Sequence, residues 1–208
     1  MRKTKRRRPQ NLPTAKKVLL LCEGDSEYAF FDYELKDYRK NITLLNVGGG
    51  GYVKIKEKLM EKESLYRVFL VVCDLDRAYK NPAEMHHLGE VINWLKSNSK
   101  ENNIFLTYEN FECWIAAWVG LDIREDYSES LANMGYRKGE HIKALLRLPQ
   151  CSIDAAKEAF KSVPSDDYFF RKEGLEWGAS HIKQNAGNRQ SNLLYFFDYL
   201  KLLASSSD

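Results

Sequence analysis

Two short apolar runs, each followed directly by acidic residues, constrain the fold of this chain more than any other feature. The first run is Val18–Cys22, followed by Glu23, and the second is residues 68–73, followed by Asp74 and Asp76. Runs of this length and composition are typical of strands that are buried on both faces of a parallel sheet. Because ligands of open α/β sheets bind beyond the carboxyl ends of the strands, we expect these acids to meet at one edge.

Carboxylates gathered at one edge repel each other unless a cation lies between them, and Mg²⁺ or Mn²⁺ prefers such hard oxygen ligands. In an extended backbone, Asp74 and Asp76 would point to the same side. The alternative for this pair is a polar turn that closes the strand. For Glu23 the alternative is a carboxylate that caps the next helix, and Gly24 after it would let the backbone approach a phosphate.

Strand-like and helical segments alternate over the first 120 residues, which predicts a parallel sheet with helices on both faces. Beyond the two runs, we expect strands at residues 42–47 and 104–107. A helix at 52–62 should direct Val53, Leu59 and Met60 inward. The remaining expectations for this half are a loop at residues 74–82, an amphipathic helix after it, and an apolar helix at 111–119 that contains Glu112.

The second half has a different character, because helical periodicity replaces strand-like runs after Gly120. We expect a basic tail at residues 1–13, an α/β core at 14–120, and a helical extension packed on the core at 121–208. Helices in the extension are predicted at residues 128–134, 139–148, 152–161 and 189–203.

Charge is unevenly distributed along the chain. The formal net charge is +3, but six Lys and Arg residues lie within the first eight positions, and the rest carries 26 basic and 29 acidic residues. Such a tail favours either an arm that attracts nucleic acid through salt-sensitive electrostatics or a solvated segment with no specific role. Both interpretations stay open.

Several function classes lack their signatures in the sequence. No apolar run is long enough to span a membrane, and the basic N-terminus has no apolar stretch behind it, so we expect a cytoplasmic protein. The four cysteines form no Cys-x-x-Cys pair, which argues against zinc and for a reducing compartment. Residues 48–51 are all glycine and could cradle a phosphate through backbone amides, but no Gly-Lys-Ser/Thr follows, so the loop is not a P-loop and a flexible linker is favoured.

Three motifs occur in order within the first 120 residues. Residues 22–27 read Cys-Glu-Gly-Asp-Ser-Glu and are followed by aromatic residues, residues 74–76 read Asp-Leu-Asp, and residues 110–114 read Asn-Phe-Glu-Cys-Trp. Together they resemble the Toprim superfamily, in which a Glu follows one strand and an Asp-x-Asp follows a later one. More closely, they resemble the RloB-like family, which is found beside ATPase genes in bacterial defence loci.

The resemblance implies a Toprim-like α/β fold and a metal-dependent nuclease. Glu23, Asp74 and Asp76 would bind Mg²⁺ or Mn²⁺ and hydrolyse a phosphodiester bond of RNA, including tRNA, or of DNA. The setting would be anti-phage defence or abortive infection, with regulation by a partner ATPase of the AAA or ABC type. No membrane partner is expected, and a homo-oligomer is left open.

Four further residues are candidates for the same site. Glu27 lies one helical turn past Glu23, and Glu112 lies in an otherwise apolar helix, so either could bind a second cation. Their alternatives are a surface charge for Glu27 and an ion pair, for example with Arg77, for Glu112. Arg77 could contact substrate phosphate or neutralise Asp76. Lys138 would supply a positive charge at the scissile phosphate, as a lysine does in Toprim nucleases of the overcoming-lysogenization type.

Two rival functions remain. The first is a non-catalytic Toprim-like subunit that binds nucleic acid or the ATPase, although all three core carboxylates are present. The second is a phosphatase of the haloacid dehalogenase type with Asp74 as nucleophile. Arg77 and Ala78 depart from that pattern, and no acidic pair follows a later strand.

Overall fold

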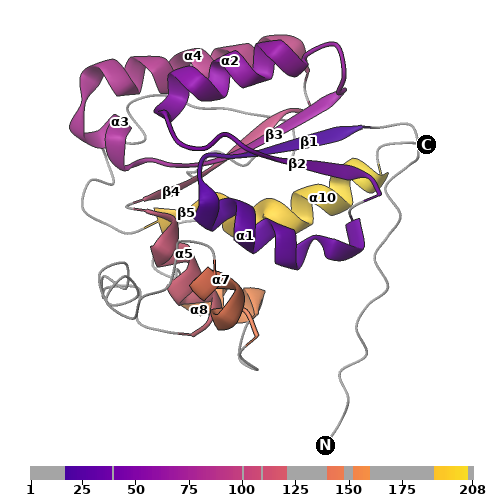
Figure 1. The fold of residues 1–208 in the computed structure, drawn as a ribbon, viewed down its shortest axis with the longest axis vertical. Helices are drawn as coiled ribbons and strands as arrows, with labels where there is room; N and C mark the ends of the chain where they lie inside the picture. Colours follow the sequence, from indigo (N-terminus) through magenta and orange to yellow (C-terminus); the bar gives the residue numbers. More distant parts are fainter. Residues whose placement is uncertain are drawn as a thin grey trace, which may run out of the picture.

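The structure, a computed structural model, describes residues 17–38, 40–99, 101–108, 110–120, 140–147, 152–159 and 190–205. It confirms the predicted α/β class, with a parallel sheet between two layers of helices (Figure 1). The sheet order is β2-β1-β3-β4-β5, in which the first four strands are parallel and β5 is antiparallel to β4. These strands are β1 (Val18–Cys22), β2 (Ile42–Asn46), β3 (Val68–Asp74), β4 (Asn103–Tyr108) and β5 (Gln190–Ser191).

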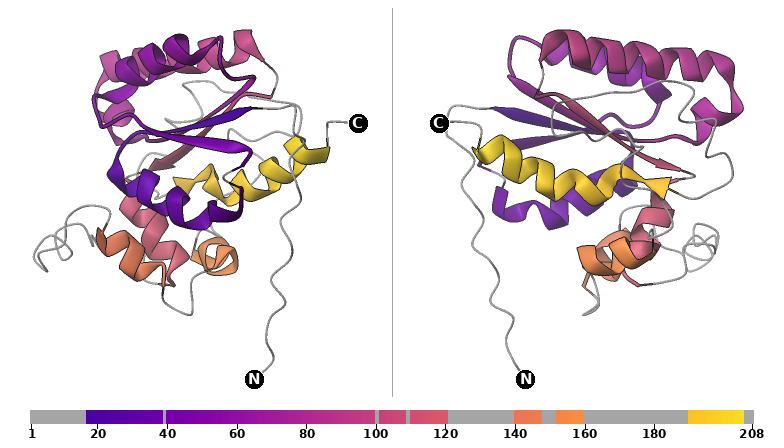
Figure 2. Two further views of the ribbon diagram at one scale, coloured as in Figure 1. Left: turned by 45° about the vertical axis from the view of Figure 1, so that its right-hand side comes forward. Right: turned by 180° about the vertical axis from the view of Figure 1, so that it is seen from behind.

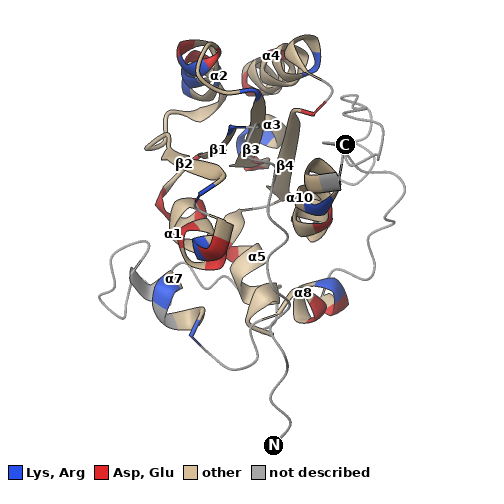
Figure 3. Cartoon of the chain, turned by 90° about the vertical axis from the view of Figure 1, so that its right-hand side faces the viewer, with Lys and Arg blue, Asp and Glu red and all other residues tan. Residues whose placement is uncertain are grey.

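Helices cover both faces of the sheet (Figures 2 and 3). One face carries α2 (Gly51–Lys62) and α4 (Pro82–Asn98), and the other carries α1 (Asp25–Glu34), α5 (Phe111–Trp118) and α10 (Phe196–Ser205). The central strands are buried on both faces, as their apolar runs predict. The remaining described elements are short: η1 (Lys36–Tyr38), α3 (Asp76–Lys80), α7 (Glu140–Leu145), α8 (Ile153–Ala159) and η2 (Asn192–Tyr195).

The two strands that end in acidic residues are neighbours at the centre of the sheet. Cys22 of β1 is level with Val72 of β3 in the parallel ladder. The chain leaves β1 into α1 on one face and leaves β3 through α3 into α4 on the other face. Because the connections that leave these two neighbouring strands depart to opposite faces, a crevice forms between their carboxyl ends, where α/β sheets bind ligands.

Aromatic side chains hold the layer of α1, α5 and α10 together. The ring of Phe30 lies 5.1 Å from that of Trp118, and the ring of Phe31 lies 4.7 Å from that of Phe196. All four residues belong to one buried cluster. Helix α10, the last apolar segment, therefore docks on the core, as its composition predicts. It packs against α1, which lies near the start of the described chain.

Three local expectations are wrong. Residues 76–80 form helix α3 where a loop was expected, because Leu75 already has right-handed helical angles. Val53 and Met60 are 43% and 56% exposed rather than inward, because Tyr52, Ile55 and Leu59 form the buried stripe of α2. The single helix expected at 189–203 is instead β5, η2 and α10.

Two of the helices predicted after Gly120 are present among the described residues. Helices α7 and α8 lie inside the predicted segments 139–148 and 152–161. The basic tail and the helix predicted at 128–134 lie outside the described residues. None of the helices that the structure describes is long and apolar enough to cross a membrane.

Candidate active site

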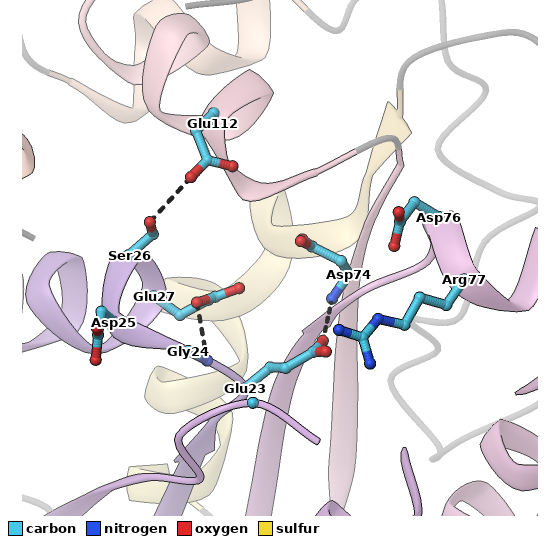
Figure 4. A pocket seen from close by; sticks show the side chains of 10 residues that line it. Glu23, Gly24, Asp25, Ser26, Glu27, Asp74, Asp76, Arg77 and Glu112 are labelled. Carbon is cyan, nitrogen blue, oxygen red and sulfur yellow. Dashed lines mark hydrogen bonds between the residues drawn. The ribbon is translucent and has the colours of Figure 1, made fainter. Parts of the chain in front are cut away.

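A pocket of about 210 Å³ lies at the carboxyl ends of β1 and β3 (Figure 4). Seven of the eight residues that the sequence predicted for the site line this pocket, whereas the eighth, Lys138, lies outside the described residues. Residues from α1, α3, α5, the end of β3, the turn after β1 and the glycine loop meet here. The lining residues are Glu23, Gly24, Asp25, Ser26, Glu27, Gly49, Asp74, Asp76, Arg77 and Glu112.

Glu23 links the two strand ends directly. Its backbone N–H donates to the carbonyl of Val72 at 3.0 Å, and its Oε2 accepts a hydrogen bond from the backbone N–H of Asp74 at 3.0 Å. Glu23 is only 8% exposed. Burial raises the pKa of Glu23, and the Asp74 N–H and the Arg77 guanidinium oppose that rise.

Asp74 has a buried carboxylate atom without a protein partner. The residue as a whole is half-buried, but Oδ1 is shielded from solvent and has no hydrogen-bond partner among the described residues. Burial, followed by the charges of Glu27 and Glu23, raises the pKa of Asp74 well above its ordinary value. A buried acceptor without a donor is costly unless something supplied from outside satisfies it.

Asp76 and Arg77 lie on the α3 side of the pocket (Figure 4). Asp76 reaches the pocket from the first turn of a helix and not from an extended segment, so the expected reason for its alignment with Asp74 is wrong. Its Oδ2 lies 3.7 Å from Nζ of Lys80. The guanidinium of Arg77 lies beside Glu23 in the close-up, and its positive charge partly offsets the rise in the pKa of Glu23.

Glu27 and Glu112 form the opposite wall of the pocket. Oε2 of Glu27 accepts from the backbone N–H of Gly24 at 3.1 Å, so Glu27 caps α1, the role that was the alternative for Glu23. Oε1 of Glu112 accepts from the Ser26 hydroxyl at 3.0 Å, so its partner is a serine rather than Arg77. Burial, with the charges of Glu23 and Glu112, raises the pKa of Glu27 to about 8.

The groups that line the pocket are ones that bind cations, but the side chains are not arranged around a single cation position. Six carboxylates and one guanidinium line it. Mg²⁺ and Mn²⁺ take oxygen ligands of this kind, and the unsatisfied Oδ1 of Asp74 is a free ligand atom. Among the described residues, however, no three His, Cys, Asp or Glu side chains are arranged as a ready ligand group. A cation shared by three carboxylates would therefore require some of these side chains to rotate.

Sequence reasoning gave no site role to Asp25 and Ser26, which line the pocket as part of the first turn of α1, nor to two residues after β2. The glycine loop was expected to be a linker, but Gly49 lines the pocket and donates its N–H to the carbonyl of Glu23 at 2.8 Å. Tyr52, read only as the start of a helix, donates its hydroxyl to the carbonyl of Asp74 at 2.7 Å. Positive φ angles at all four glycines, from 69° to 96°, explain why glycine is needed there. No pattern in the sequence indicates the tyrosine contact.

Comparison with known proteins gives no match: no family model, no curated protein and no solved structure is similar to this chain. The resemblance to Toprim proteins therefore stays a prediction from motifs. The arrangement of carboxylates in the pocket is the strongest structural indication of function.

Proposed function

We propose that this chain is a Mg²⁺- or Mn²⁺-dependent endonuclease with a Toprim-like site. One observation carries the proposal: the carboxylates predicted from three separate motifs converge on one pocket, at which Asp74 presents a buried oxygen without a partner. A set of acids so placed is costly without a neutralising cation, which supports a site built for a cation rather than for stability.

In this proposal, Glu23, Asp74 and Asp76 hold the cation, and Glu27 and Glu112 on the opposite wall offer ligands for a second one. When bound, Mg²⁺ would polarise the phosphate and lower the pKa of the attacking water. The chain itself supplies orientation: the Asp74 N–H fixes the carboxylate of Glu23, and the Ser26 hydroxyl fixes that of Glu112.

The charges of the pocket also set the order of binding. A phosphodiester is an anion, and six carboxylates repel it while a single guanidinium attracts it. Nucleic acid should therefore bind weakly until cations neutralise the acids. Once it is bound, Arg77 is placed to contact a non-bridging oxygen, and Gly24 lets the phosphate approach the N-terminus of α1.

The biological setting rests on the motif resemblance alone. We propose RNA, including tRNA, or DNA as the substrate, a role in anti-phage defence in the cytoplasm, and regulation by an ATPase encoded nearby. The basic residues at positions 2–8 would add affinity for nucleic acid, and Lys138 would add a charge at the scissile phosphate.

One observation favours the rival, a non-catalytic subunit that binds nucleic acid or the ATPase. No three acidic side chains of the described chain form a ready ligand group, as a degenerate site would show. The two functions differ in a measurable way, because only the nuclease requires cation binding that depends on Asp74.

The deciding experiment is Mg²⁺- and Mn²⁺-dependent cleavage of total tRNA, cellular RNA and plasmid DNA, with and without the neighbouring ATPase. Wild type is compared with Asp74→Asn and with Glu57→Gln, which removes a charge from the exposed face of α2. We expect cleavage by wild type and Glu57→Gln, and a loss of at least about 100-fold in Asp74→Asn. No cleavage, together with no Mn²⁺ binding by calorimetry, would establish the non-catalytic subunit instead.

A further inference from the structure

Tyr52 is a buried tyrosine whose hydroxyl reaches the backbone of an acidic residue in the pocket. It lies in the first turn of α2, is 1% exposed, and donates to the carbonyl oxygen of Asp74 at 2.7 Å. Its ring packs in the apolar layer between the sheet and helices α2 and α4. The contact is therefore fixed at both ends, by packing of the ring and by the hydrogen bond.

The backbone around Asp74 is held from three directions. Its N–H donates to the Glu23 carboxylate at 3.0 Å, its carbonyl accepts from Tyr52, and the next N–H, that of Leu75, donates to the carbonyl of Thr107 at 2.9 Å. Asp74 is the last residue of β3, so it lies where the strand ladder ends. Tyr52 replaces a partner that the sheet no longer provides.

The same segment also fastens Glu23. The N–H of Val47 donates to the carbonyl of Cys22 at 2.9 Å, and the N–H of Gly49 donates to the carbonyl of Glu23 at 2.8 Å. Residues 47–52 thus bind the backbone of the first acid at one end and the backbone of the second acid at the other. The side chain of Glu23 closes this loop of contacts by binding the Asp74 N–H (Figure 4).

We propose that Tyr52 is a positioning residue that sets where the carboxylate of Asp74 lies relative to that of Glu23. This inference rests on the proposed function, because it assigns the placement to cation binding. Tyr52 is not among the residues that line the pocket, so we expect its hydroxyl to touch neither cation nor substrate. It acts through the peptide unit of Asp74, in the way that partners of metal ligands orient them elsewhere.

The test compares Tyr52→Phe with Tyr199→Phe. Tyr199 is a matched control, because it is 5% exposed and donates its hydroxyl to a backbone carbonyl, that of Glu101, at 2.8 Å, but on the other face of the sheet. Both changes remove one buried hydroxyl and keep the ring. Two quantities are measured in each variant: Mn²⁺ affinity by calorimetry, and amide hydrogen exchange of Asp74 and Leu75 in the metal-free protein.

We expect Tyr52→Phe to weaken Mn²⁺ binding about 10-fold and to speed exchange at both amides, and Tyr199→Phe to change neither. If wild type and Tyr52→Phe bind Mn²⁺ equally tightly, the inference is overturned while the proposed function stands. Faster exchange in that case would show that the contact only stabilises the fold. Wild type that binds no Mn²⁺ would overturn the proposed function, and this inference with it.

Discussion

The carboxylate of Glu23 accepts a hydrogen bond from the backbone N–H of Asp74, although the two residues are 51 positions apart in the chain. The first acid of the site therefore orients the second. The charge of Glu23 and its hydrogen bond can be tested separately, because a neutral side chain of the same shape can accept the same hydrogen bond.

Glu23→Gln should keep the fold and lose cation affinity. The amide oxygen of Gln can still accept from the Asp74 N–H, but the negative charge is gone. Because burial raises the pKa of Glu23, its ionised form is unfavourable in the metal-free protein, and its removal should increase the stability. Urea unfolding and Mn²⁺ calorimetry measure the two effects. Glu23→Leu, which cannot accept the bond, should lose stability, and equal stability of both variants would contradict the role of the bond.

The stability of the metal-free protein should fall as pH rises. Burial raises the pKa of Glu27 from 4.5 to about 8, and the pKa of Asp74 is also raised. The folded state therefore binds more protons than the unfolded chain. The stabilisation by these protons is complete below the pKa of the unfolded chain and is lost as pH rises through the pKa of the folded state. Between about pH 6 and pH 8.5 we expect a loss of at least about 1 kcal/mol, or about 2–4 °C in Tm.

Differential scanning fluorimetry at both pH values measures this slope. Glu27→Gln should flatten it, since the titrating group is removed. Mg²⁺ should flatten it as well, because a bound cation favours the ionised acids. A stability that rises over this range in the metal-free protein would contradict the raised pKa values.

Asn192→Ala should destabilise the edge of the sheet strongly. The buried Asn192 side chain accepts from the N–H of Leu106 at 2.6 Å and donates to the carbonyl of Ile104 at 3.1 Å, so it satisfies two backbone groups of β4. Leaving both unpaired should cost about 2–4 kcal/mol in the free energy of unfolding. Asn98→Ala is the control, since that exposed side chain donates to the carbonyl of Trp94, and its loss should cost at most about 0.5 kcal/mol.

Two Gly→Ala substitutions should change stability in opposite directions. Gly50 has a φ of 96°, which an L side chain rarely adopts, so Gly50→Ala should cost about 1–2 kcal/mol. Gly89 lies inside α4 with no atom within 4 Å of an added Cβ, so Gly89→Ala should add about 0.5–1 kcal/mol. Thermal unfolding of both variants tests the pair, and a loss in Gly89→Ala would contradict the open space beside it.

The central sheet could be predicted from sequence because its signals are local. The runs that form β1 and β3 are apolar and short, and the acids follow them at once. The parallel arrangement then places Glu23 and Asp74 at the same edge without any knowledge of tertiary contacts. The acids Glu23 and Asp74 were found for this reason.

The rest depends on contacts between distant segments. Strand β5 is only two residues long and exists because it pairs with β4, so no periodicity reveals it. The buried face of α2 is set by Tyr52, whose ring and hydroxyl both have partners in tertiary structure. Helix α3 begins where the acidic pair suggested a turn, since Asp is favoured in both settings.

The contact between Phe31 and Phe196 has a consequence for synthesis on the ribosome. The ring of Phe196 also lies 5.0 Å from the ring of Phe105 in β4, and the side chain of Asn192 accepts a hydrogen bond from the same strand. The buried cluster between α1 and the sheet is therefore incomplete until residues 190–205 have left the ribosomal exit tunnel. A nascent chain could pair β1 to β4 earlier, but it would expose aromatic surface, so the assembly of the domain is completed only after residues 190–205 have emerged.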